Sequence, residues 1–134
     1  CTLPATTTVV ALGNNGTARA DRALTFNGTA AAVGAIALGS GAQATSDDAL
    51  ALGPSSIAGG LASIVIGPSI ARGSFGVAIG LQNSASGNFS VAIGKNARTA
   101  NRQGSIVLGD GCAGFSSDSV YATANNQFVA RGCG

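Results

Sequence analysis

The side chains that most often carry enzyme chemistry are scarce in this sequence. It contains no histidine, and its one lysine is Lys95. The five acidic residues are all aspartates: Asp21, Asp47, Asp48, Asp110 and Asp118. Without histidine or glutamate, a Ser-His-Asp triad, a Cys-His pair and a histidine-containing zinc site are excluded within this sequence. We therefore expect no enzymatic activity, no cofactor and no metal.

The charged residues allow two interpretations. The aspartates fall in expected turns and are predicted to be solvated; a calcium site is the alternative, but the regular aspartate spacing of a calcium-binding repeat is absent. Four basic residues fall in the outer halves of neighbouring repeats: Arg72, Lys95, Arg98 and Arg102. They are either solubilising charges or a weakly basic stripe. Because the net charge is only +2 and the basic residues are scattered, we expect no nucleic-acid partner.

Three cysteines lie near the ends of the sequence. Cys112 and Cys133 flank the C-terminal segment and can close it with a disulfide, which would contribute about 3 kcal/mol through loop entropy. Reduced thiols are the alternative. Cys1 is then left for an intermolecular bond, a lipid or no bond. A disulfide would indicate a location outside the cytoplasm, and because residue 1 is not methionine we expect a longer parent protein.

The composition favours a thin, packed structure over a disordered one. Apolar residues make up 46% of the sequence and charged residues 9%, whereas disordered chains combine low hydropathy with high charge. Aromatic residues are only 4%, and 21 residues are glycine, so large side chains are too few for a thick core. No stretch approaches the ~20 apolar residues of a membrane-spanning helix, so we expect no membrane insertion by this segment.

A five-residue pattern, small–apolar–small–apolar–glycine, recurs every 13 to 15 residues. Its closing residues are the predicted corner glycines: Gly39, Gly53, Gly67, Gly80, Gly94 and Gly109. Weaker copies contain Val10 and Leu12, then Leu24 and Phe26, and a degenerate copy has its apolar pair at Val120 and Ala122.

The spacing within each repeat predicts an all-β solenoid. Two-residue alternation is typical of a strand with two different faces, and glycine permits a sharp corner after it. Small residues three and five positions past the glycine predict a second, shorter strand, although Ile70 and Arg72 break that pattern in one repeat. Each repeat of about 14 residues would be one coil, stacked in parallel on the next; nine coils would make a rod of roughly 43 Å.

The two faces of the main strand are predicted to have different partners. We expect the larger apolar residues to form core columns inside the coils: Ile36, Leu38, Leu50, Leu52, Ile64, Ile66, Val77, Ile79, Val91, Ile93, Ile106 and Leu108. The opposite face carries no charge through six repeats, which predicts an interface between copies of the chain at Ala37, Ala51, Val65, Ala78, Ala92 and Val107. An exposed stripe is the alternative, and it would risk aggregation. A dimer or a fourfold assembly is not excluded by these residues.

The run Ser90-Val91-Ala92-Ile93-Gly94-Lys95-Asn96-Ala97-Arg98-Thr99 resembles the head repeat of trimeric autotransporter adhesins, the YadA-like head. The resemblance is strong over residues 35–111 and weaker over residues 8–34. It implies a left-handed parallel β-roll in which three identical chains surround a common axis. It also implies an outer-membrane-anchored fibre on the bacterial surface that adheres to extracellular matrix or to a cell-surface receptor. We assign residues 1–111 to head repeats and residues 112–134 to a C-terminal cap or connector.

Some residues depart from this family pattern. Pro54 and Pro68 follow strand glycines where the family has polar residues, and the tail from Ser119 to Arg131 resembles segments ahead of chaperone-of-endosialidase domains in phage tail proteins. The alternative function is therefore a phage or prophage tail-fibre shaft, a spacer on a virion tail before a receptor-binding or chaperone domain. An ice-binding solenoid ranks last, since no threonine ladder runs through the repeats.

Overall fold

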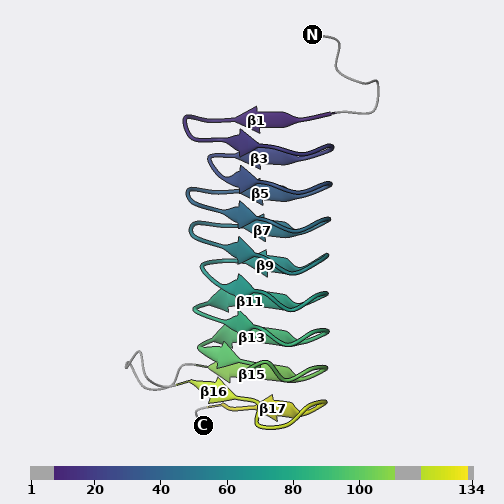
Figure 1. Cartoon of the computed structure of the whole chain (residues 1–134). Coiled ribbons are helices and arrows are strands. Elements are labelled where there is room, and N and C mark those ends of the chain that lie inside the picture. Colours follow the sequence, from purple (N-terminus) through teal and green to yellow (C-terminus); the bar gives the residue numbers. More distant parts are fainter. Residues whose placement is uncertain (1–7, 111–118, 133–134) are drawn as a thin grey trace.

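The computed structural model describes residues 8–110 and 119–132, which form a single stack of parallel β-coils with no helix (Figure 1). The chain advances steadily along the stack, so that its first and last described strands lie at opposite ends (Figure 1). Each coil contributes one longer and one shorter strand to two separate sheets. The predicted all-β parallel solenoid of about 14 residues per coil is confirmed.

The longer strands form a nine-stranded sheet. They are β1 (Val10–Leu12), β3 (Leu24–Phe26), β5 (Ile36–Leu38), β7 (Leu50–Leu52), β9 (Ile64–Ile66), β11 (Val77–Leu81), β13 (Val91–Lys95), β15 (Ile106–Asp110) and β17 (Phe128–Ala130). The shorter strands form an eight-stranded sheet. They are β2 (Thr17–Ala18), β4 (Thr29–Ala30), β6 (Gln43–Ala44), β8 (Ile57–Ala58), β10 (Ile70–Ala71), β12 (Ser84–Ala85), β14 (Ala97–Arg98) and β16 (Val120–Tyr121).

Small side chains line the interior of the coils, which is the reverse of the predicted arrangement. The six residues predicted as the interface between chains are all 0% exposed inside a single chain: Ala37, Ala51, Val65, Ala78, Ala92 and Val107. Together with alanines of the shorter strands, such as Ala44, Ala58 and Ala85, they form the hydrophobic core. They therefore cannot contact another copy of the chain.

The twelve predicted core residues instead point outward from the nine-stranded sheet, so this prediction is wrong. These residues are half-buried or exposed: Ile36, Leu38, Leu50, Leu52, Ile64, Ile66, Val77, Ile79, Val91, Ile93, Ile106 and Leu108. Larger side chains usually mark the buried face of a strand, because most sheets pack about 10 Å from the next layer. Here about 14 residues must supply two strands and two corners, which brings the sheets too close for leucine or isoleucine. The largest apolar side chains that are fully buried are only Val65 and Val107.

The glycines that close the longer strands are required by the stacking of the coils. The φ angle is positive at five of the six predicted corner glycines: Gly39, Gly53, Gly67, Gly80 and Gly94. A Cβ atom on Gly80 would also lie 2.1 Å from the carbonyl oxygen of Gly94 in the next coil. Gly109 does not have a positive φ, but a Cβ there would lie 2.5 Å from the carbonyl oxygen of Lys95.

Two irregular regions of the sequence still fit the stack. In the 13-residue repeat, Ile70 pairs with Ser84 and Ala71 with Ala85, so the inward positions shift by one residue and the predicted break in the pattern does not occur. In the tail, β16 pairs with β14 and β17 with β15, which adds a further coil. The degenerate copy is misplaced by the sequence pattern: Val120 and Ala122 are buried on the side of the shorter strands, and Phe128 continues the outward apolar face.

Candidate binding surfaces

The outward face of the nine-stranded sheet carries two continuous columns of apolar side chains. The parallel register stacks like residues on each other, as in the run from Ile64 through Val77 to Val91. The second column follows in the same way from Ile66 through Ile79. The strand pairs extend both columns from β1 to β17 without a charged residue. Sheet formation thus converts the sequence repeat into one long apolar surface.

Many of these side chains remain open to solvent in the single chain. Ile66 is 42% exposed in the middle of the sheet, and Phe26 and Phe128 towards its two ends are 49% and 67% exposed. Single exposed apolar residues are ordinary on proteins, but a contiguous strip marks an interaction surface. The chemistry of this face is therefore association through apolar contact.

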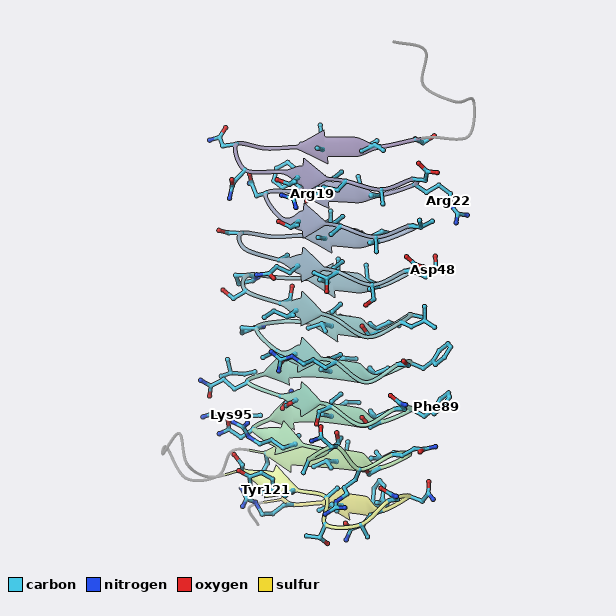
Figure 2. All side chains as sticks on the ribbon, in the orientation of Figure 1. Arg19, Arg22, Asp48, Phe89, Lys95 and Tyr121 are labelled. Carbon is cyan, nitrogen blue, oxygen red and sulfur yellow. The ribbon has the colours of Figure 1, made fainter. Side chains whose placement is uncertain are left out.

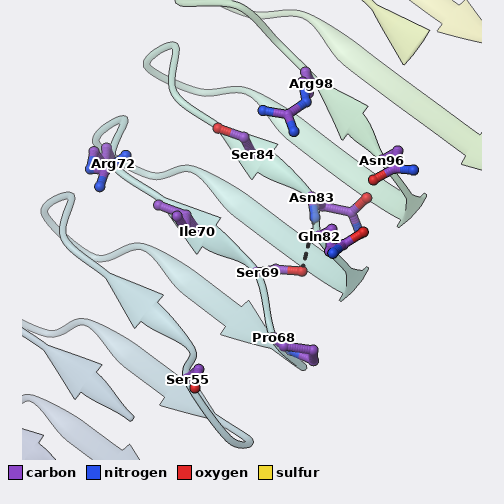
Figure 3. A pocket seen from close by; sticks show the side chains of 10 residues that line it. All are labelled: Ser55, Pro68, Ser69, Ile70, Arg72, Gln82, Asn83, Ser84, Asn96 and Arg98. Atoms are coloured by element: carbon purple, nitrogen blue, oxygen red, sulfur yellow. Dashed lines mark hydrogen bonds between the residues drawn. The ribbon is translucent and has the colours of Figure 1, made fainter. Parts of the chain in front are cut away.

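The opposite side of the stack contains a polar hollow on the eight-stranded sheet. The hollow measures about 370 Å³ and spans strands β10, β12 and β14 (Figure 3). It is lined by Ser55, Pro68, Ser69, Ile70, Arg72, Gln82, Asn83, Ser84, Asn96 and Arg98. Most of these side chains are hydroxyls, amides or guanidinium groups, so the hollow can donate hydrogen bonds and attract negative charge.

The four basic residues considered from the sequence do not form one stripe. Arg72 and Arg98 line the hollow. Lys95 ends β13 on the other sheet, in register with Asp110, and Arg102 is exposed in a loop outside the hollow. The sequence pattern suggested the basic residues but missed Gln82 and Asn96. Both residues lie two positions after a strand glycine, and both have a positive φ angle. This shared spacing is the sequence signal that would have placed them at the same corner.

The aspartates of the described chain act in turns and pairs. Asp47 accepts a hydrogen bond from the backbone N–H of Val33 at 3.1 Å, and Asp110 lies 3.7 Å from the guanidinium of Arg131. Within residues 8–110 and 119–132, no three metal-ligating side chains come together. The same ranges hold no helix with the length and hydropathy of a membrane span. Asp118 and the predicted Cys112–Cys133 pair, like Cys1, lie outside the described residues.

An exposed aromatic pair lies at the corner that precedes the longer strands. Phe75 and Phe89 stack with ring centroids 5.2 Å apart and planes within 3°. Figure 2 shows Phe89 on the same edge of the stack as Arg22 and Asp48. All four residues have positive φ angles near 55°, which sets this corner in successive coils.

Comparison with protein-family models matches the YadA head domain repeat at residues 30–56, 44–69 and 71–97. These segments together cover half of the chain and coincide with the most regular coils. The chain belongs to the YadA head domain repeat family. Neither the curated proteins nor the solved structures gave a significant match. In this YadA-like head, the matched repeats supply the middle of both apolar columns and most of the polar hollow.

Proposed function

We propose that this chain is the non-enzymatic head segment of a trimeric surface adhesin. The observation that carries the proposal is the uncovered apolar face of the nine-stranded sheet. A strip of this length would promote aggregation if it stayed in solvent. Three copies arranged around one axis, each with this face directed inward, would cover it completely. Family membership supports both this trimer and a left-handed coil.

The proposed function follows from the geometry of such a trimer. The interface would be the column residues, and the three eight-stranded sheets would face outward along the fibre. A stiff stack holds binding surfaces at fixed spacing, and linked weak contacts can raise overall affinity by roughly 10²–10⁴. The partner would be a matrix protein or a receptor on another cell, and the location would be the outside of a bacterium on an outer-membrane-anchored fibre.

The oligomeric state provides the first test. We expect light scattering to give about three times the 12.8 kDa mass of one chain. Ile66→Asp places a charge in the proposed interface and should produce monomers. Ile57→Asp is the matched control, because Ile57 points outward from the eight-stranded sheet. Ile57 is less exposed than Ile66 in the single chain. If the variants acted only through the stability of the monomer, Ile57→Asp would therefore destabilise the chain more than Ile66→Asp. A monomeric unsubstituted chain would contradict the trimer, and so would an equal loss of trimer in the two variants.

Adhesion is tested with the same proteins. The parent trimer and the Ile66→Asp monomer are passed over immobilised matrix proteins and over cell monolayers. We expect retention of the trimer to exceed that of the monomer by about two orders of magnitude, as expected for linked contacts. A trimer that binds neither surface would contradict the adhesin function.

A tail-fibre shaft is the second candidate. Its support is the tail, where β16 and β17 extend both sheets by another coil instead of closing the stack. A rod that continues in this way suits a spacer that connects to a further domain. The two functions are separated by the domains found beside such repeats in a full-length gene product: a coiled coil and a membrane anchor favour the adhesin, and a chaperone domain favours the shaft.

A further inference from the structure

The polar hollow on the eight-stranded sheet has an excess of positive charge. Arg72 follows β10 and Arg98 ends β14, and none of the described residues that line the space between them is acidic. Their backbone positions differ by two strand spacings across the sheet, about 10 Å, and by two residues along it, about 7 Å, which places them about 12 Å apart. Within the described ranges neither guanidinium has an ion pair. Among the residues that the structure describes, no carboxylate would therefore compete with an anion for these two arginines.

One of these arginines is already oriented. The Nε of Arg98 donates a hydrogen bond to the hydroxyl of Ser119 at 3.1 Å, and the side chain is half-buried. This contact restrains the guanidinium, and no other described residue accepts a hydrogen bond from its remaining N–H groups. Arg72 is exposed on the other side of the hollow (Figure 3). A planar guanidinium pairs well with the two oxygens of a carboxylate or the oxygens of a sulfate.

Asn96 provides an independent indication of a ligand. Its side chain lines the hollow and is only 1% exposed, yet among the described residues neither its amide nitrogen nor its amide oxygen has a hydrogen-bond partner. Asn83, in the preceding coil, is fully engaged: its Nδ2 donates to the carbonyls of Ile79 and Gly94, and its Oδ1 accepts from the N–H of Ala97. Buried polar groups rarely remain unpaired, because the lost hydration is costly. A hydroxyl-bearing ligand would satisfy this amide.

We infer that the hollow binds one acidic sugar unit of an anionic polysaccharide. The carboxylate or sulfate would lie between Arg72 and Arg98, and the ring hydroxyls would bond to Gln82, Ser84 and Asn96. A volume of about 370 Å³ suits a ligand of this size. This inference rests on the proposed function in one respect: the trimer leaves the eight-stranded sheet exposed, so that three hollows meet the same polymer.

The test measures binding of the full chain to immobilised heparin, with hyaluronan as a polymer without sulfate and dextran as a neutral polymer. We expect the chain to bind heparin and not dextran. Hyaluronan carries carboxylates but no sulfate, so binding to hyaluronan assigns the site to a carboxylate, and binding to heparin alone assigns it to a sulfate. Arg72→Gln and Arg98→Gln should each weaken heparin binding roughly tenfold, the scale of one charge-assisted contact. The matched control is Arg102→Gln, which removes the same charge outside the hollow and should change affinity less than about twofold. Asn96→Gly keeps the positive φ and should weaken binding without removing charge.

Equal losses from Arg102→Gln and Arg98→Gln would overturn the inference, because binding would then follow net charge alone. Equal binding to heparin and dextran, or no binding to either, would also overturn it. A heparin disaccharide separates this result from the fate of the trimer, because the hollow lies within one chain. The Ile66→Asp monomer and the parent should bind the disaccharide equally, whereas only the parent should gain affinity for the polymer. If the unsubstituted chain is a monomer that binds the disaccharide, the binding site in the hollow is supported and the trimer is contradicted. If it is a trimer that does not bind the disaccharide, the trimer is supported and the binding site is contradicted.

Discussion

Replacing two glycines by alanine tests whether the coils are stacked as closely as the structure indicates. Gly80 and Gly41 both have positive φ angles, +116° and +71°. Their surroundings differ: a Cβ on Gly80 would lie 2.1 Å from the carbonyl oxygen of Gly94, whereas nothing lies nearer than 3.9 Å to a Cβ on Gly41. The same substitution therefore separates backbone strain from a clash between coils.

The expected costs follow from these contacts. Gly41→Ala adds only the penalty of a left-handed alanine, about 1–2 kcal/mol. Gly80→Ala adds strain of about 1–3 kcal/mol, forces β11 away from β13, and disturbs the 2.8 Å hydrogen bond from Asn83 to the Gly94 carbonyl. Losing this bond and one ladder bond between β11 and β13 adds about 2 kcal/mol, so the total is about 3–5 kcal/mol.

Thermal unfolding followed by circular dichroism, at one fixed protein concentration, measures the difference. At about 4 °C per kcal/mol for a domain of this size, Gly41→Ala should lower Tm by about 4–8 °C and Gly80→Ala by about 12–20 °C. Equal shifts for the two variants would refute the close stacking of strand-closing glycines. A larger shift for Gly41→Ala would refute the assignment of the tight contact to Gly80.

Three further predictions concern the interior of the coils. Ala78→Leu forces a large side chain between the sheets and should destabilise the chain by about 3 kcal/mol in urea unfolding; an unchanged midpoint would contradict the inward placement of the small face. Asn83→Ala removes three hydrogen bonds and should cost about 2–4 kcal/mol. Asn96→Gly breaks no side-chain hydrogen bond and removes a buried unpaired amide, so it should cost less than Asn83→Ala; similar urea midpoints for the two variants would show that the corner amides are equivalent. Ser90→Ala loses the 2.6 Å hydrogen bond to the Gly87 carbonyl and should lower stability by about 1 kcal/mol, and a higher Tm in a thermal melt would show that this buried hydroxyl is a net cost.

The sequence pattern predicts only some of the residues that line the polar hollow. Arg72 and Arg98 stand out in the sequence because charged residues are rare in it. They lie 26 positions apart, which is two coils along the stack, and the pairing of β10 and β14 with the single strand β12 between them brings them to one hollow. The unpartnered amide of Asn96 depends on contacts in three dimensions, since Asn83 next to the same corner is fully bonded. The one-residue shift in the 13-residue repeat likewise becomes clear only from the strand register.

The repeat by itself determined the class of fold, the coil length and the positions of the strand-closing glycines. Those features are local, because alternation and backbone freedom act within a few residues of each other. Which face of the strand is buried was decided by the tertiary structure. Alternation separates Ala78 from Ile79 but does not give the distance to the opposing sheet, and that distance is fixed only when both corners of a coil have formed. Because the gap is narrow, the small side chains fill it, and the larger apolar side chains remain outside to meet other molecules.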